Sequence, residues 1–160
     1  MEKVIDWKGY FMSLAHLSAM RSKDPNTKVG AVIVDDKNRI ASIGYNGMAT
    51  GCSDYEFPWE REGNSNDTKY PFVVHSELNA ILNAGGKSLS GARIYVSLFP
   101  CNECAKAIIQ SGIEEIVYLS DKYKETDSTK ASKRMLTSAG VKLTQFIPEK
   151  DKIVLDFDIE

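Results

Sequence analysis

The sequence predicts an α/β fold with three layers, αβα, built on a five-stranded mixed sheet. After residue 75, strand-like and helix-like patterns alternate, which favours parallel strands joined by right-handed crossovers. Before residue 75, two apolar runs flank a polar turn, and this hairpin would add an antiparallel edge. The chain has 160 residues, enough for one domain with its own core, so we expect a single domain over residues 1–160.

The first element is expected to be a helix from Asp6 to about Arg21. Asp6 is a favoured N-cap residue, and the segment Asp24-Pro25-Asn26 breaks the helical pattern. Four large apolar residues recur at helical spacing and are predicted to face the core. They are Trp7, Phe11, Leu14 and Leu17.

The hairpin comes next, with strands at residues 29–34 and 39–44 around a turn at 35–38. A long irregular stretch then covers residues 48–74. Loops of that length in a compact domain are usually functional or disordered. Because its composition is too varied for a low-complexity linker, we expect this stretch to be ordered by packing against another subunit.

The second half of the chain alternates helices and strands, and glycines mark the helix ends. The expected elements are a helix from residue 75 to near Gly85-Gly86, a strand at 92–98, a helix at 101–111, a strand at 115–120, a helix at about 127–139 and a strand at 141–147. No internal repeat interrupts this order.

Charge and cysteine content narrow the classes of function. The formal net charge is -2, whereas proteins that bind a nucleic-acid backbone usually carry a basic excess, so we expect no nucleic-acid partner. We find no apolar run that could span a bilayer and no signal peptide, and therefore expect a cytoplasmic protein with no membrane partner. Three cysteines, two of them in C-x-x-C, fit metal ligation in a reducing compartment.

Two short motifs carry the candidate catalytic chemistry. H-x-E comprises His75 and Glu77, and P-C-x-x-C places Cys101 and Cys104 three residues apart. Together these motifs are typical of zinc-dependent nucleobase deaminases. One imidazole and two thiolates would supply three protein ligands and leave the fourth position open for water, as in catalytic zinc sites.

These residues can meet at one metal only in a particular arrangement. Residues two apart on a helix point in different directions, so His75 must lie at the very start of its helix, with the metal beyond that end. Cys101 and Cys104 would share one face of a first helical turn, whose start suits Pro100. The positive end of each helix dipole would favour thiolate over thiol.

Three other interpretations of the motifs stay open. A closed structural zinc site needs a fourth ligand, but only His16 and Cys52 remain, and neither has zinc-like spacing. The motifs could bind no metal at all. The C-x-x-C could also be a redox pair, although the upstream H-x-E makes that a minor reading.

Beyond the two motifs, the sequence resembles the deoxycytidylate (dCMP) deaminases of the cytidine deaminase-like superfamily, over nearly the whole chain. The additional matching segments separate it from deaminases of cytosine base, free cytidine and tRNA adenosine, and favour the eukaryotic-type form. These segments are Tyr10-Phe-Met, Arg21-Ser-Lys-Asp-Pro-Asn26, Val29-Gly-Ala, Gly44-Tyr-Asn46-Gly47, Gly51-Cys-Ser-Asp54, Asp67-Thr-Lys-Tyr-Pro, Ser120-Asp-Lys-Tyr123 and Asp156-Phe-Asp.

The resemblance implies a cytidine deaminase-like fold and hydrolysis of dCMP to dUMP and ammonia, which supplies dUMP for dTTP synthesis. One catalytic Zn2+ per subunit would be bound by His75, Cys101 and Cys104. Glu77 would transfer protons between water and the cytosine ring as a general acid and base. Ser76 stands where alanine is common in the family, a small change that should not disturb the ligands.

The resemblance also implies assembly and regulation. Members of the family are commonly hexamers, activated by dCTP and inhibited by dTTP, each nucleotide being bound with Mg2+. Some members hold a second, structural zinc with additional cysteine and histidine residues. Here Lys23 or Asp24 stands at the corresponding cysteine position and the long loop lacks histidine, so one zinc is expected.

Substrate contacts follow from the same resemblance. The loop Asn26-Thr27-Lys28, together with Tyr123, would hold the base and the phosphate. Asn46 would hold the deoxyribose hydroxyl, and the backbone of Ser76 the base edge. Plainer interpretations stay open, because Lys28 and Lys122 could be solvated charges and Tyr123 a packing residue.

The candidate contacts of the effector nucleotide lie after the second strand and in the helix that starts at residue 75. They are Gly44, Tyr45, Asn46, Gly47 and Asn79. Gly44 and Gly47 could equally serve a turn that needs positive φ.

Other functions also stay open. The chain could deaminate another cytosine nucleotide, including one that acts on both dCMP and dCTP, or a nucleic acid, which its charge disfavours. It could also be a catalytically silent, nucleotide-binding regulatory paralogue. Glu77 argues against that role, because a structural zinc site has no need of the carboxylate.

Overall fold

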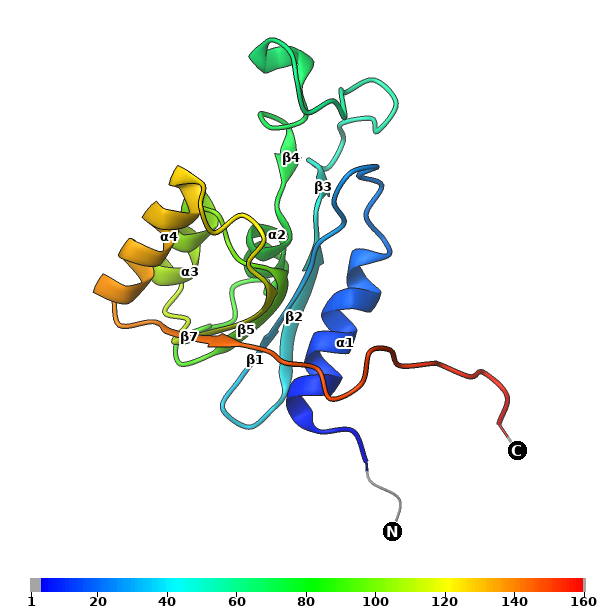
Figure 1. Cartoon of the computed structure of the whole chain (residues 1–160), viewed down its shortest axis with the longest axis vertical. Helices are drawn as coiled ribbons and strands as arrows, with labels where there is room; N and C mark the ends of the chain where they lie inside the picture. The colour runs from blue at the N-terminus through cyan, green and yellow to red at the C-terminus, as the bar shows by residue number, and fades with distance from the viewer. Residues whose placement is uncertain (1–3, 160) are drawn as a thin grey trace.

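In a computed structural model that describes residues 4–159, five strands form one mixed sheet (Figure 1). The strands are β1 (Gly30–Val34), β2 (Ile40–Tyr45), β5 (Arg93–Leu98), β6 (Glu115–Ser120) and β7 (Lys142–Gln145). Their order is β2-β1-β5-β6-β7; β1 is antiparallel to both β2 and β5, and β5, β6 and β7 are parallel. The predicted parallel second half and antiparallel edge hairpin are both confirmed.

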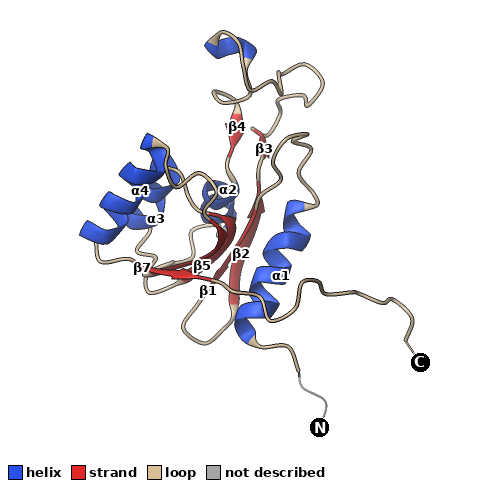
Figure 2. Cartoon of the chain, in the orientation of Figure 1, coloured by secondary structure: helices blue, strands red, loops and turns tan. Residues whose placement is uncertain are grey.

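Helices cover both faces of this sheet (Figure 2). The helices are α1 (Trp7–Ala19), α2 (Ser76–Asn83), α3 (Asn102–Gln110) and α4 (Asp127–Ser138). Strand side chains alternate between faces, so Val32 and Tyr95 pack against α1, whereas Ile33 and Ile94 share a core with α2, α3 and α4. The predicted three-layer αβα arrangement is therefore confirmed.

The buried face of α1 differs from the predicted one. Trp7 and Leu17 are 58% and 46% exposed, so the prediction that they face the core is wrong. The small residue Ala15 lets the helix approach the sheet so closely that a Cβ on Gly30 would lie 1.8 Å from the Ala15 carbonyl oxygen. Small residues at the point of contact push the large ones to the rim, where Trp7 stacks on Phe11 with 5.5 Å between ring centroids.

One edge of the sheet collects most of the candidate site residues. Because β1 and β2 run antiparallel and β1 is antiparallel to β5, the start of β1 lies beside the ends of β2 and β5. The Gly30 amide donates to Ser97 Oγ (3.2 Å), and just beyond the strands the Phe99 amide donates to the Ser120 carbonyl (2.9 Å). The carboxyl ends of parallel strands are the usual place for a ligand site in open α/β sheets.

The long stretch after β2 is ordered and extends away from the sheet (Figure 1). It is bounded by a small antiparallel pair that the sequence did not predict, β3 (Gly47–Met48) with β4 (Val73–Val74), and contains one 3-10 turn, η1 (Ser65–Asp67). Its expected contact with another subunit stays a prediction. Within residues 4–159, no helix is long and apolar enough to cross a membrane.

Candidate active site

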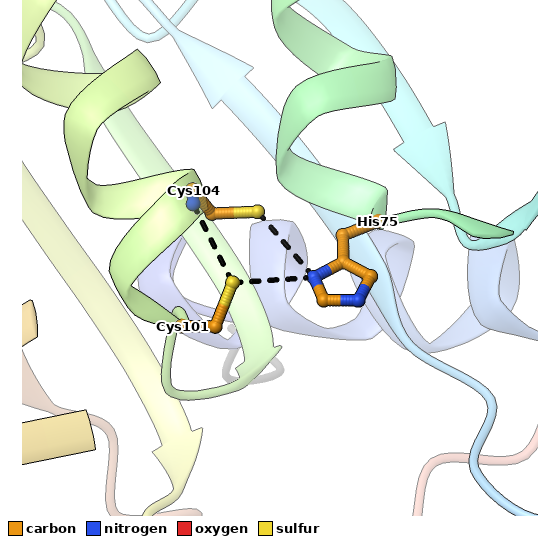
Figure 3. Close-up of side chains that lie close together, drawn as sticks. All are labelled: His75, Cys101 and Cys104. Atoms are coloured by element: carbon orange, nitrogen blue, oxygen red, sulfur yellow. Dashed lines mark hydrogen bonds between the residues drawn. The ribbon is translucent and has the colours of Figure 1, made fainter. Parts of the chain in front are cut away.

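Three metal-ligand side chains meet between α2 and α3 (Figure 3). His75 Nδ1 lies 3.3 Å from Cys101 Sγ and 3.6 Å from Cys104 Sγ, and all three ligand atoms lie within 4.8 Å of one another. Cys104 is buried, Cys101 is half-buried and His75 is exposed, so the cluster opens on one side to solvent. Cys52 remains free in the long stretch and does not join the cluster.

The starts of two helices position these ligands. His75 is the N-cap of α2, so its ring projects beyond the helix end while Glu77 lies in the first turn. Cys101 is the N-cap of α3, and its sulfur accepts a hydrogen bond from the Cys104 amide (3.4 Å). Pro100 lies one residue before this cap rather than in the first turn, where the sequence placed it. This is the helix-start geometry that the two motifs require.

The two nitrogen–sulfur distances in the cluster match those expected around a tetrahedral zinc. With Zn–S near 2.3 Å and Zn–N near 2.0 Å, nitrogen and sulfur ligands of a tetrahedral ion lie about 3.5 Å apart. The two nitrogen–sulfur distances here, 3.3 and 3.6 Å, fall on either side of that value. Imidazole and thiolate are also the donors that zinc prefers, so the residues present fit the metal.

The cluster is strongly polarised without a metal. A hydrogen bond with Cys104, reinforced by His75, lowers the pKa of Cys101 to about 4. The hydrogen bond with Cys101 raises the pKa of His75 to about 9, and the same sulfur contact together with burial raises the pKa of Cys104. At neutral pH the metal-free site therefore holds a Cys101 thiolate, a His75 imidazolium and a Cys104 thiol.

Glu77 lies next to the ligand cluster as a buried acid. Its side chain is 4% exposed, and burial is the main reason that its pKa is raised. The Ser76 hydroxyl donates a hydrogen bond to Glu77 Oε2 (2.9 Å). A carboxyl group of raised pKa can hold a proton near neutral pH and release it again, as a general acid and base must.

The candidate substrate residues fall into two groups. Asn46 is buried and supports the backbone, because its Oδ1 accepts from the Val29 amide (2.8 Å) and its Nδ2 donates to the Thr27 carbonyl (2.9 Å). Asn26 and Lys28 are exposed at the sheet edge. Asn46 thus shapes the loop in which Asn26, Thr27 and Lys28 lie.

Tyr123, which follows β6 in the chain, lies close to this loop. Partial burial would raise the pKa of the Tyr123 phenol, but a hydrogen bond with Thr27 and the positive charges of Lys122 and Arg61 lower it. Lys122 Nζ lies 5.0 Å from the centre of the Tyr123 ring. Thr27 and Tyr123 therefore bring the segments before β1 and after β6 together, and their contact with substrate stays a prediction.

The candidate effector residues lie where α2 crosses β2. A Cβ on Gly44 would lie 2.4 Å from the Ser76 carbonyl oxygen and 2.4 Å from the Ala80 amide, so Gly44 allows close packing of α2 on the strand. Neither Gly44 nor Gly47 has positive φ, so the interpretation that they serve such a turn is wrong. Asn79 Nδ2 donates to the Tyr45 carbonyl (2.7 Å) and thereby ties α2 to the end of β2.

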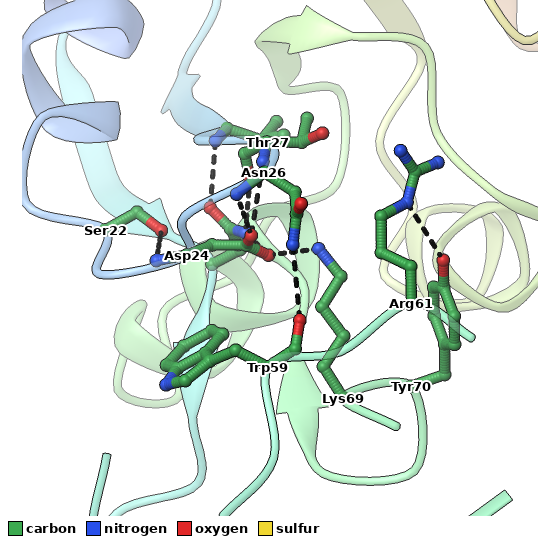
Figure 4. A network of polar contacts seen from close by, with 10 residues as sticks. Ser22, Asp24, Asn26, Thr27, Trp59, Arg61, Lys69 and Tyr70 are labelled. Carbon is green, nitrogen blue, oxygen red and sulfur yellow. Dashed lines mark hydrogen bonds and ion pairs between the residues drawn. The ribbon is translucent and has the colours of Figure 1, made fainter. Parts of the chain in front are cut away.

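Sequence reasoning missed the buried ion pair of Asp24 and Lys69, which lies close to the site (Figure 4). Asp24 is 1% and Lys69 7% exposed. Asp24 Oδ1 also accepts from the amides of Asn26 (2.8 Å) and Thr27 (3.1 Å). The only signal in the sequence was that both residues fall in segments shared with the family that the chain resembles.

A three-layer αβα fold, with one histidine and two cysteines at two helix starts and a buried glutamate beside them, is the arrangement of the zinc-dependent nucleobase deaminases. Residues 5–120 match the family model described as "Cytidine and deoxycytidylate deaminase zinc-binding region". The chain belongs to this family and is a deaminase.

Relatives agree with this assignment along most of the chain. The human protein named "Deoxycytidylate deaminase" is 54% identical over 155 residues, 96% of this chain and 87% of the human one. A "Probable deoxycytidylate deaminase" of Drosophila melanogaster is 53% identical, covering 98% of this chain and 80% of its own.

A solved structure shows the same fold. The dCMP deaminase from the cyanophage S-TIM5, in complex with dCMP and dUMP, superposes with a TM-score of 0.70 at 26% identity. The match covers 91% of this chain and 100% of the phage chain. The fold is therefore that of the cytidine deaminase-like proteins.

Proposed function

We propose that this protein catalyses the zinc-dependent hydrolysis of dCMP to dUMP and ammonia. The observation that carries the proposal is the buried carboxyl group of Glu77 beside a histidine and two cysteines whose ligand atoms lie within 4.8 Å of one another. The names of the human and fly relatives support dCMP as substrate, as does the cyanophage structure with dCMP and dUMP.

In the proposed mechanism, His75, Cys101 and Cys104 would hold one zinc per subunit. When bound, the metal would supply a Lewis acid and lower the pKa of a water molecule toward about 7. Glu77 takes a proton from the attacking water and delivers it to N3 of the cytosine ring, which makes C4 electrophilic. The water oxygen bonds to C4. Glu77 then takes the remaining proton of the C4 hydroxyl and passes it to the 4-amino group, which leaves as ammonia while C4 retains the oxygen as a carbonyl. The Ser76 hydroxyl orients the Glu77 carboxyl during both transfers.

Substrate orientation would come from the loop before β1 and from the segment after β6. Asn26, Thr27 and Lys28 are held at the sheet edge by Asn46 and Asp24, and Tyr123 closes the other side. The deoxyribose hydroxyl would lie near Asn46 and the base edge near the Ser76 backbone. Rigid backbone support of this kind favours a fixed orientation of the substrate.

The biological setting is part of the same proposal. The dUMP would feed dTTP synthesis in the cytoplasm, and a hexamer would be activated by dCTP and inhibited by dTTP, each with Mg2+. The packing of α2 on Gly44, together with the hydrogen bond from Asn79 of α2 to the Tyr45 carbonyl, offers a route from an effector to the catalytic helix, whose N-cap is His75. Neighbouring Asn46 and Gly47 complete the proposed effector segment.

Product formation by the zinc-loaded protein tests this proposal. Ammonia and uracil-nucleotide formation are followed with dCMP, dCTP, deoxycytidine and a single-stranded DNA oligonucleotide as separate substrates. We expect turnover to be fastest on dCMP and, at subsaturating dCMP, to rise with dCTP-Mg2+ and fall with dTTP-Mg2+. Comparable turnover of dCTP would indicate a bifunctional enzyme, and no turnover of any substrate would indicate a silent paralogue.

A further inference from the structure

Arg61 lies near Tyr123, one of the candidate substrate residues. Its Nε donates to the Tyr70 hydroxyl at 3.4 Å (Figure 4). Glu60 and Glu62 flank it in sequence, yet among residues 4–159 no ion pair involves Arg61. Its guanidinium therefore has no direct carboxylate partner in the described part of the chain.

Arg61 is also held close to the residues that enclose the substrate region. The Asn26 side-chain amide donates to the Trp59 carbonyl (3.2 Å), and the Lys69 amide donates to the Glu60 carbonyl (3.0 Å). The ion pair of Lys69 with Asp24 fixes the later part of the long stretch, which leads back to β4. These contacts hold the backbone on both sides of Arg61 against the loop that precedes β1.

The guanidinium faces two phenolic hydroxyls on this side of the molecule. The Tyr70 hydroxyl and then Tyr123 raise the pKa of Arg61, which places both rings near its charge. Tyr123 in turn lies near Thr27 and Lys122. One arginine, one lysine and two phenol groups therefore lie near one another beside the loop that holds the candidate substrate residues.

We propose that Arg61 binds the phosphate of the nucleotide substrate, with the Tyr70 hydroxyl orienting the guanidinium and Tyr123 completing the subsite. This inference rests on the proposed function and names a residue that selects nucleotides over nucleosides. A guanidinium presents several N–H donors in one plane and matches a phosphate with two parallel, charge-assisted hydrogen bonds. Arg61 is suited to this role because no carboxylate between residues 4 and 159 forms an ion pair with it.

Steady-state kinetics of Arg61→Gln on dCMP and on deoxycytidine test the inference. We expect KM for dCMP to rise about 10- to 100-fold, the range for a lost hydrogen bond to a charged group, with kcat changed less than about threefold. Turnover of deoxycytidine, which has no phosphate, should stay within about twofold of the wild-type value. Tyr70→Phe should raise KM for dCMP by a smaller factor. Arg39→Gln removes the same charge from the turn between β1 and β2 and serves as the matched control.

Equilibrium binding separates this inference from the proposed function. Arg61→Gln should weaken binding of dUMP about 10- to 100-fold but leave binding of deoxyuridine unchanged, and this measurement requires no catalysis. The phosphate role would be overturned if Arg61→Gln bound dUMP as tightly as the wild-type protein does. It would also be overturned if the variant lost the same affinity for dUMP and for deoxyuridine. A wild-type protein that binds dUMP through Arg61 but does not turn over dCMP would contradict the proposed function alone.

Discussion

Two polar clusters at the same sheet edge are built in opposite ways. The zinc cradle consists of His75, Cys101 and Cys104, and each of its ligands belongs to a short motif at the start of a helix. The loop anchor consists of Asp24 and Lys69, which are 45 residues apart, with the backbone amides of Asn26 and Thr27. Each half of the cradle is a short motif at a helix start, and the two halves meet across 26 residues or more, whereas neither residue of the anchor belongs to such a motif.

The two clusters would therefore serve different purposes: the cradle serves the reaction, and the anchor serves the positioning of the substrate. The cradle brings three possible ligand atoms together, and in the proposed mechanism the adjacent Glu77 acts as the acid, so the proposed reaction depends on a few positions in and next to α2 and α3. The anchor fixes the loop before β1 and carries the segment with Arg61, so it governs how a substrate is held. Changes in the cradle should remove the metal and the reaction, while changes in the anchor should affect stability and substrate binding.

The largest effect is expected from removing one cradle ligand. Cys104→Ser should lower zinc affinity by more than about 100-fold, because loss of even an outer-shell partner costs 10- to 100-fold. Deaminase turnover should be lost with the metal. Zinc content and a competition titration with a chelator measure this effect, and Cys52→Ser, in the free cysteine of the long stretch, is the control. Equal zinc affinity in the two variants would show that Cys104 is not a ligand.

The anchor is tested by two lysines that tie the same long stretch to the same loop. Lys69→Met leaves Asp24 buried without its cation, and breaking a buried pair in this way typically costs about 3–5 kcal/mol of unfolding free energy. Lys23 pairs with Asp54 at the exposed surface, so Lys23→Met should leave the unfolding midpoint unchanged. Urea unfolding of the zinc-loaded variants compares them directly. Equal destabilisation would remove the special role of the buried pair.

Zinc binding should depend steeply on pH in a direction set by the cradle. At pH 7 the metal must displace one proton from the Cys104 thiol, whose pKa is raised, and one from His75, whose pKa is about 9. Cys101, with a pKa of about 4, is already a thiolate. Zinc affinity should therefore rise about 100-fold per pH unit near pH 7 and less steeply above pH 9.

Calorimetric titration of the metal-free protein in buffers of different ionisation enthalpy counts the protons released on zinc binding. We expect about two at pH 7 and about one above pH 9, where His75 is already neutral. Release of no protons at pH 7 would contradict the charge state assigned to the cradle.

A smaller effect is expected where the effector segment meets the catalytic helix. Gly44→Ala places a methyl group against the backbone of α2 and should lower the unfolding free energy by about 1–3 kcal/mol. Gly47→Ala is the matched control, because a Cβ there meets no atom within 4 Å and φ is not positive. Thermal unfolding measures both, and equal midpoints would show that close packing at Gly44 is not required.

The sequence was sufficient for the sheet and for the convergence of the cradle. Alternating patterns after residue 75 predicted the parallel strands, and the requirement that His75 begin a helix predicted how one histidine and two cysteines could meet. The strand and helix pattern is periodic along the chain, and each of the two motifs consists of residues only two or three positions apart at a helix start. Local geometry and pattern determine such features, so a single sequence can carry them.

The same reasoning from periodicity and short motifs could not predict how distant segments pack. The exposed side chains of Trp7 and Leu17 depend on how closely α1 approaches Gly30, which helical periodicity alone does not indicate. The short β3–β4 pair and the partnership of Asp24 with Lys69 join segments whose proximity is decided by the folded chain. The roles of Arg61 and Tyr70 were missed for that reason.

The most direct test of the central claim is ammonia release from dCMP by zinc-loaded Glu77→Gln beside the wild-type protein. We expect the variant to bind one zinc per chain and to unfold cooperatively, while its turnover falls by about 10²- to 10⁴-fold, the usual contribution of a general acid and base. Glu114→Gln, an exposed glutamate just before β6, should retain wild-type turnover. Wild-type turnover by Glu77→Gln would contradict the assignment of proton transfer to this residue.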